Sequence, residues 1–86
     1  MTRHRVELYT RQRCCLCDEA KRLLGQVRRD LPFELVEIDV DQSPALAARY
    51  GDEVPVVLVD GVRHAKLRLD SARLRRRLAA PAPEIP

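Results

Sequence analysis

The spacing of apolar residues changes twice between residues 6 and 40, and these changes restrict the folds open to the chain. Val6–Tyr9 is short and rich in strand-forming residues, whereas apolar residues recur at helical spacing over Cys15–Arg29. Phe33–Val40 returns to the alternation of a strand. A helix between two strands predicts a parallel pair joined by a right-handed crossover.

A short second helix is expected after this unit. The segment Asp41 to Ser43 is typical of an N-cap, and Pro44 suits the first helical position. The pattern predicts a helix over residues 45–50. Gly51 is expected to end it in the left-handed conformation.

The last part of the chain contains the pattern of a hairpin followed by a helix. The apolar run Val54–Val59 and a partner strand over 62–67 flank Asp60-Gly61, a dipeptide typical of two-residue turns. A final helix follows, with Leu74 and Leu78 facing inward. These signals predict an antiparallel pair at this end of the sheet.

The resulting order, β-α-β-α-β-β-α, predicts an α/β fold with a four-stranded mixed sheet flanked by three helices. A chain of 86 residues has room for one domain. We expect that domain to occupy residues 1–80, followed by a Pro-rich C-terminal tail over 81–86, and we expect a monomer.

Charge and composition exclude several functional classes. The net charge is only +3, and Tyr9, Phe33 and Tyr50 are the only aromatic residues, so we expect no nucleic-acid partner. No apolar run approaches the length of about 20 residues that spans a membrane, and no signal peptide is visible, so we expect no membrane partner and a cytoplasmic location. The run Arg75-Arg76-Arg77 is interpreted as the solvated face of the last helix, with an acidic or nucleic-acid partner as the alternative.

The three cysteines of the chain lie within four positions, where the first strand's loop meets the first helix. Cys14 and Cys17 are three residues apart and therefore neighbours on a helix surface, as a disulfide requires. The helix N-terminus and the positive charge of Arg13 favour a thiolate at Cys14. The pair is therefore predicted to form a dithiol–disulfide couple, with Cys14 as nucleophile and Cys17 as resolving thiol.

Two other interpretations of the cysteines remain open. One is a zinc or iron–sulfur binding or carrier protein, and the other is incidental packing. A zinc site needs about four ligands, but His4 starts the first strand at its far end and His64 lies in the hairpin.

The sequence resembles the thioredoxin superfamily, and within it the small glutaredoxin-like proteins, over roughly Val6 to Leu78. The matching segments are Leu8-Tyr9-Thr10, Cys14-Cys15-Leu16-Cys17-Asp18, Glu37-Ile38-Asp39-Val40-Asp41 and Tyr50-Gly51-Asp52-Glu53-Val54-Pro55. The resemblance implies a thiol–disulfide oxidoreductase active in cell redox homeostasis. It implies no bound cofactor, protein or small-molecule disulfides as substrates, and glutathione or a flavin reductase as electron donor.

The same resemblance assigns the substrate-binding residues. It implies a cis peptide before Pro55, which would face the cysteines and leave the Val54 backbone free to pair with a substrate strand. It places Arg11 where glutaredoxins have a basic residue that contacts a carboxylate of glutathione. Arg13 is expected to add positive charge to the same surface.

The chain departs from the glutaredoxin pattern at several places, among them a turn from Gly51 to Pro55 that is one residue shorter. Cys15-Leu16 stands between the cysteines where glutaredoxins usually have Pro-Tyr. Leu67 to Ser71 contains no glycine where glutaredoxins have a Gly-Gly segment that holds one end of glutathione. Since side chains fill the space that glycines leave open, we expect weakened glutathione binding.

Overall fold

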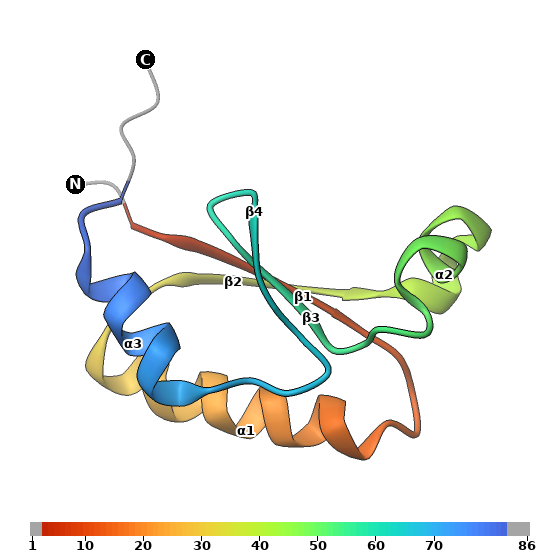
Figure 1. The fold of residues 1–86 in the computed structure, drawn as a ribbon, viewed down its shortest axis with the longest axis horizontal. Coiled ribbons are helices and arrows are strands. Elements are labelled where there is room, and N and C mark those ends of the chain that lie inside the picture. Colours follow the sequence, from red (N-terminus) through yellow and green to blue (C-terminus); the bar gives the residue numbers. More distant parts are fainter. Residues whose placement is uncertain (1–2, 83–86) are drawn as a thin grey trace.

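The computed structural model describes residues 3–82 and has the expected architecture of four strands and three α-helices (Figure 1). The strands form one mixed sheet in the order β2-β1-β3-β4. Most of the tail expected at 81–86 lies outside the described residues. The elements are β1 (Arg5–Thr10), α1 (Cys15–Asp30), β2 (Glu34–Asp39), a 3-10 turn η1 (Val40–Gln42), α2 (Pro44–Tyr50), β3 (Val56–Val59), β4 (Val62–Lys66) and α3 (Ser71–Ala79).

The strand pairing follows from the connections. β1 pairs with β2 in parallel across α1, and it pairs antiparallel with β3 on its other side. β3 and β4 form the expected hairpin, whose turn residues Asp60 and Gly61 have φ values of 53° and 82°. Two consecutive left-handed residues are typical of the type I′ turn, which matches the twist of a hairpin. β3 begins at Val56 rather than Val54, because Pro55 has no N–H to donate to the sheet.

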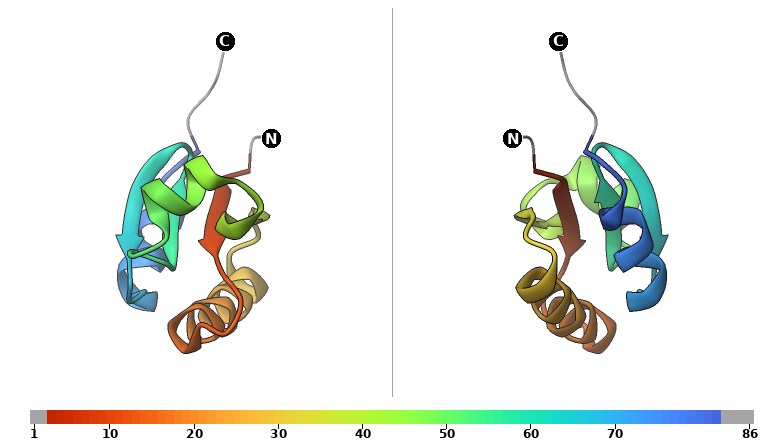
Figure 2. Two further views of the ribbon diagram at one scale, coloured as in Figure 1. Left: turned by 90° about the vertical axis from the view of Figure 1, so that its right-hand side faces the viewer. Right: turned by 90° about the vertical axis from the view of Figure 1, so that its left-hand side faces the viewer.

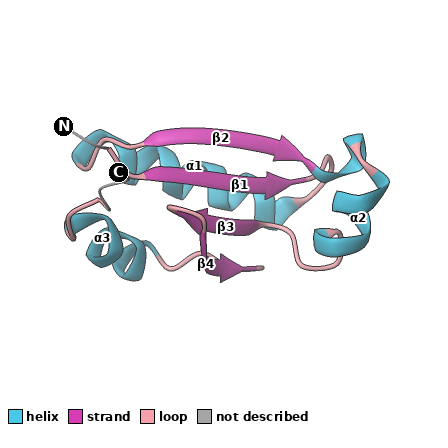
Figure 3. Cartoon of the chain, turned by 90° about the horizontal axis from the view of Figure 1, so that it is seen from above, coloured by secondary structure: helices cyan, strands magenta, loops and turns pink. Residues whose placement is uncertain are grey.

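Two groups of buried side chains make up the core. α1 and α3 cover one face, and α2 lies on the other side near the C-terminal end of β1, as the views in Figures 2 and 3 show. The larger group joins the sheet to α1 and α3, and includes Leu8, Leu24 and Leu74. The smaller group contains Cys17 and Tyr50, so that the expected reactive cysteines are attached to the core. None of the helices within residues 3–82 combines the length and the apolar character needed to cross a bilayer.

The expected conformation of Gly51 is wrong. Its φ and ψ are −54° and −37°, the right-handed helical region, and its N–H donates to Ala47 O at 2.9 Å. The helical pattern thus continues one residue further before Glu53 N–H closes a turn onto Tyr50 O. Glycine is required here for space rather than for a left-handed backbone, because an added Cβ would collide with Ala47 O.

A polar network joins both ends of the described chain to the hairpin turn. The His4 ring lies 2.5 Å (Nδ1) from Asp60 Oδ2 and 2.6 Å (Nε2) from Ala80 O, just after α3. The N–H of Arg5 donates to Asp60 Oδ1 at 2.9 Å. Burial raises the pKa of Asp60, but the hydrogen bonds from Arg5 and His4 and the charges of His4 and Arg77 outweigh it, so the pKa lies below its usual value of 3.8.

We therefore expect Asp60→Asn to destabilise the protein in a pH-dependent way. A carboxyl whose pKa is depressed by folding stabilises the native state above its unfolded pKa, and this contribution disappears as pH falls through the folded pKa. Asparagine tolerates the positive φ of this position, so the substitution tests the charge. Urea unfolding should show a loss of about 1–3 kcal/mol at neutral pH. This loss should shrink as pH falls below about 4; a loss that stays constant down to acid pH would contradict the role of the carboxylate.

Candidate functional site

Cys14 and Cys17 form a disulfide at the start of α1, with Cα atoms 5.1 Å apart. Cys14 is the N-cap residue, with an extended backbone (φ −117°, ψ 108°), and Cys17 lies within the first turn. The loop before α1 places Cys14 beyond the end of β1, so the sheet fixes where the helix begins. The structure thus brings together the two cysteines that the spacing predicted as a redox pair.

The environments of the two sulfur atoms differ. Cys14 is partly exposed, whereas Cys17 is only 1% exposed and belongs to the core. Cys14 Sγ accepts a hydrogen bond from the N–H of Cys17 at 3.1 Å. A backbone donor and the positive end of the helix dipole both stabilise a negative sulfur. Cys14 is therefore placed to attack an external disulfide, and Cys17 is reached only through Cys14.

The segment before β3 lies against the disulfide. The Val54–Pro55 peptide is cis, as the resemblance implied. Val54 is buried in the same group as Cys17 and Tyr50, against which Cys14 also packs. Within residues 3–82, the backbone N–H and C=O of Val54 have no hydrogen-bond partner. These two groups are available to an extended chain placed beside Cys14.

Arg11 lies in the loop between β1 and Cys14, but its guanidinium is already engaged. Its Nη2 and Nε donate to the two carboxylate oxygens of Asp41 at 2.7 and 3.3 Å, and its Nη1 donates to Gly51 O at 2.9 Å. The hydrogen bonds from Arg11 lower the pKa of Asp41. Arg11 therefore joins the cysteine loop to η1 and to the end of α2, and a bound carboxylate would have to compete with Asp41.

Arg13 directly precedes Cys14 and is exposed, with a left-handed backbone (φ 56°). No ion pair of its guanidinium is present within residues 3–82. It therefore adds an unpaired positive charge beside the disulfide, as the sequence suggested.

The sequence did not identify Tyr50 and Asp41 as neighbours of the site. Tyr50 stacks on Tyr9 with ring centroids 4.3 Å apart, and both rings border the group that holds Cys17 and Val54. Burial and the Glu7 carboxylate raise the pKa of Tyr9, so this ring stays neutral at physiological pH. Asp41 was treated only as part of a helix start, and no local pattern indicates its ion pair with Arg11, which lies 30 residues away in sequence.

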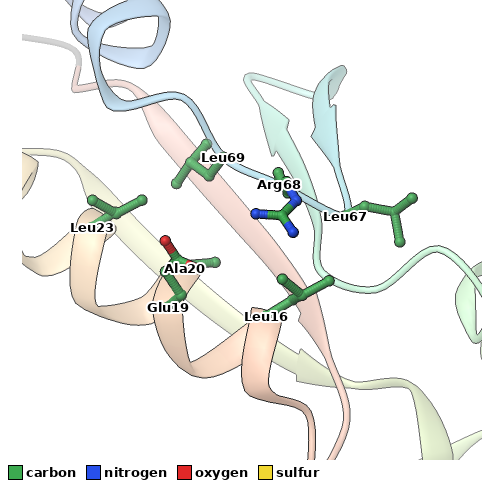
Figure 4. Close-up of a pocket in the computed structure, with 7 residues that line it drawn as sticks. All are labelled: Leu16, Glu19, Ala20, Leu23, Leu67, Arg68 and Leu69. Carbon is green, nitrogen blue, oxygen red and sulfur yellow. The ribbon is translucent and has the colours of Figure 1, made fainter.

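A small hollow of about 110 Å³ lies between α1 and the segment after β4, beside the second turn of the cysteine helix. Figure 4 shows its side chains, which come from one face of α1 and from Leu67, Arg68 and Leu69. Leu67 has a left-handed backbone (φ 65°) and is 42% exposed, and its N–H donates to Pro55 O at 2.8 Å. A leucine thus occupies the conformation that glycine adopts most easily.

The third cysteine, Cys15, is free and exposed, and it lies outside the disulfide. Within residues 3–82, no three His, Cys, Asp or Glu side chains are grouped so that they could hold a metal ion. The Cys14–Cys17 disulfide itself supports thiol–disulfide exchange at this site.

Comparisons with known proteins agree with this geometry. The family model described as Glutaredoxin-like domain (DUF836) matches residues 5–79. The uncharacterized protein Rv0508 of Mycobacterium tuberculosis is 39% identical over 84 residues, which cover 92% of this chain and 87% of that protein. A thioredoxin of Methanocaldococcus jannaschii is 33% identical over 64 residues, covering 71% of this chain and 75% of that protein.

Solved structures agree as well. The X-ray structure of protein XcR50 from X. campestris has a TM-score of 0.73 and 36% identity, covering 88% of this chain and 99% of that chain. Solved thioredoxins share the fold. The four-stranded mixed sheet with three helices is therefore the thioredoxin fold.

Proposed function

The chain belongs to the glutaredoxin-like domain family, and from that premise we propose that it is a dithiol–disulfide oxidoreductase. One observation carries the proposal: Cys14 and Cys17 are paired at the start of α1, with Cys14 partly exposed and Cys17 buried. This asymmetry is what a nucleophile and a resolving thiol require.

In the reduced protein, the Cys14 thiolate attacks one sulfur of a substrate disulfide. A Cys14–substrate mixed disulfide forms, and the other substrate sulfur leaves as a thiolate. Cys17 then attacks Cys14 Sγ, which forms the Cys14–Cys17 disulfide and releases the second substrate thiol. The substrate gains two electrons and the protein loses two, so an external thiol or a flavin reductase must return them.

The neighbouring residues support the first step. The Cys17 N–H and the dipole of α1 stabilise the attacking thiolate, and Arg13 adds positive charge. The Val54 backbone offers a donor and an acceptor to a substrate chain beside Cys14. Protein disulfides and small disulfides are both within reach of such an open site.

Reduction of insulin by dithiothreitol tests the proposal. Precipitation of the insulin B chain should be accelerated by the protein in proportion to its concentration. An equal amount of the protein with Cys14 and Cys17 both replaced by serine is the matched control. Equal rates for the two proteins would contradict the proposed activity.

We expect glutathione to be a weak electron donor. Leu67 occupies space that a glycine would leave open to a ligand, and Arg11 is held by Asp41. The measurement compares turnover of a glutathione mixed disulfide supported by glutathione and its reductase with turnover supported by a thioredoxin reductase. Saturable, efficient turnover at about millimolar glutathione, in the ordinary KM range, would contradict this expectation.

A further inference from the structure

A basic groove runs between the edge strand β4 and the exposed side of α3. Two adjoining hollows of about 420 and 530 Å³ form it, and both are lined by Arg63, His64 and Arg73. Lys66 contributes to the first hollow, and Arg76 and Arg77 to the second. Among the described residues, no Asp or Glu lines either hollow. We define the basic groove by these six residues: Arg63, His64, Lys66, Arg73, Arg76 and Arg77.

The ion pairs of the described residues leave part of this charge unpaired. Glu53 pairs with Arg63 and Lys66 at 3.3 and 3.1 Å, outside the lining of the groove. Arg73 and Arg76 are exposed on α3 and take part in no ion pair within residues 3–82. Uncompensated cations in a concave surface attract anions and concentrate them there.

His64 lines both hollows and is only partly exposed. Its Nε2 is buried and has no hydrogen-bond partner in the described part of the chain. Burial, followed by the charges of Arg73 and Arg77, lowers the pKa of His64. At neutral pH the positive charge of the basic groove therefore comes from its arginines and Lys66 rather than from His64.

The basic groove leads to the disulfide. β4 is at the edge of the sheet, so its outer backbone groups face no other strand. Its last residue, Lys66, is followed by Leu67, whose N–H donates to Pro55 O. Pro55 directly follows Val54, which packs in the same group as Cys14 and Cys17. A chain lying along β4 would therefore reach the cysteines at one end.

An acidic polypeptide fits the basic groove better than a nucleic acid does. Binding of single strands depends on aromatic side chains that stack on the bases. The three aromatic residues lie elsewhere: Phe33 is buried under α1, and Tyr9 and Tyr50 pack together near the disulfide. An extended acidic peptide can instead pair its backbone with the free edge of β4 and place carboxylates against Arg73 and Arg76.

We propose that the basic groove docks an acidic, extended segment of the protein whose disulfide exchanges with Cys14 and Cys17. The assignment of this partner as a redox substrate rests on the proposed function. The docking itself does not, because it depends on residues of β4 and α3 that are distinct from the cysteines.

Binding is tested first without any redox step. A fluorescent peptide of alternating Glu and Ser, without cysteine, is titrated with the protein carrying serine at positions 14 and 17, and its anisotropy is followed. The double variant Arg73→Glu/Arg76→Glu should bind it at least about tenfold more weakly. The matched control is Arg22→Glu/Arg29→Glu, which reverses two exposed charges on α1. It should bind the peptide with the same affinity as the protein that carries only the two serine substitutions.

Three results would overturn the docking proposal. The first is equal affinity of the α3 variant and the α1 variant for the acidic peptide. The second is equal affinity of the protein for the Glu/Ser and the Gln/Ser peptides, in which case the charges along β4 would serve only to prevent edge-to-edge association. The third is tighter binding of a single-stranded oligonucleotide of the same charge, which would make the basic groove a nucleic-acid site.

A second measurement separates docking from chemistry. The acidic and the Gln/Ser peptides are each given one cysteine in mixed disulfide with thionitrobenzoate. Their reduction by the wild-type protein, with dithiothreitol as electron donor and its uncatalysed rate subtracted, is followed by the release of coloured thionitrobenzoate. We expect kcat/KM to be at least about tenfold higher for the acidic peptide, and this preference should vanish in Arg73→Glu/Arg76→Glu. Equal kcat/KM for both peptides overturns the docking proposal alone, whereas failure to reduce either peptide overturns the proposed function.

Discussion

Cys14→Ser is expected to reduce disulfide-reductase activity to the background rate, a loss of about three orders of magnitude or more. Serine keeps the size of the side chain, but at neutral pH its hydroxyl carries no negative charge and does not attack disulfides. The partly exposed Cys14 is the sulfur that a substrate can reach, since Cys17 is 1% exposed. Insulin reduction measures the effect, and the far-ultraviolet circular dichroism of the variant confirms that it remains folded.

Cys15→Ser is the matched control for this variant. Cys15 is exposed and free, and neighbouring positions on a helix lie about 100° apart around its axis. It should therefore retain most of the activity. Loss of activity in folded Cys15→Ser, or retained activity in Cys14→Ser, would contradict the two-cysteine mechanism.

Cys17→Ser is expected to abolish multiple turnover and to accumulate a mixed disulfide. Cys14 can still attack the substrate, but no buried thiol remains to release the second substrate sulfur. Incubation with a single equivalent of a thionitrobenzoate disulfide should release one equivalent of the coloured thiolate and add one thionitrobenzoate to the protein mass, because the stabilised Cys14 thiolate reacts faster than the exposed Cys15. Peptide mapping should place that group on Cys14.

The contrary outcomes are equally specific. Label found on Cys15 would make Cys15 the nucleophile. Sustained turnover by Cys17→Ser with glutathione absent would show that another group resolves the mixed disulfide.

The sequence predicted the parts of the site that depend on local pattern. The helical spacing after Cys14 indicated where α1 begins, and the i, i+3 separation placed Cys17 one turn away. The hairpin at Asp60 and Gly61 followed from the turn preference of that dipeptide. These features depend on neighbouring residues, so they can be inferred before the fold is known.

The features that sequence reasoning missed depend on contacts between distant segments. Arg11 meets Asp41 because the parallel strands β1 and β2 end side by side and η1 directly follows β2, and no local signal indicates that pair. Gly51 was interpreted through backbone preference, whereas its reason is the nearby Ala47 carbonyl. The three arginines 75–77 looked like a solvated helix face. Only the position of β4 beside α3 shows that Arg76 and Arg77 share a concave surface with Arg63 and His64.

A redox titration of the purified protein, with thiol counting and metal analysis at each end point, tests the central claim most directly. The claim is that Cys14 and Cys17 form a reversible two-electron couple. We expect a single two-electron transition, with three titratable thiols in the reduced protein and one in the oxidised protein, and without stoichiometric metal. Stoichiometric zinc or iron held by the cysteines, or three thiols that stay reduced at every oxidising potential, would contradict the account.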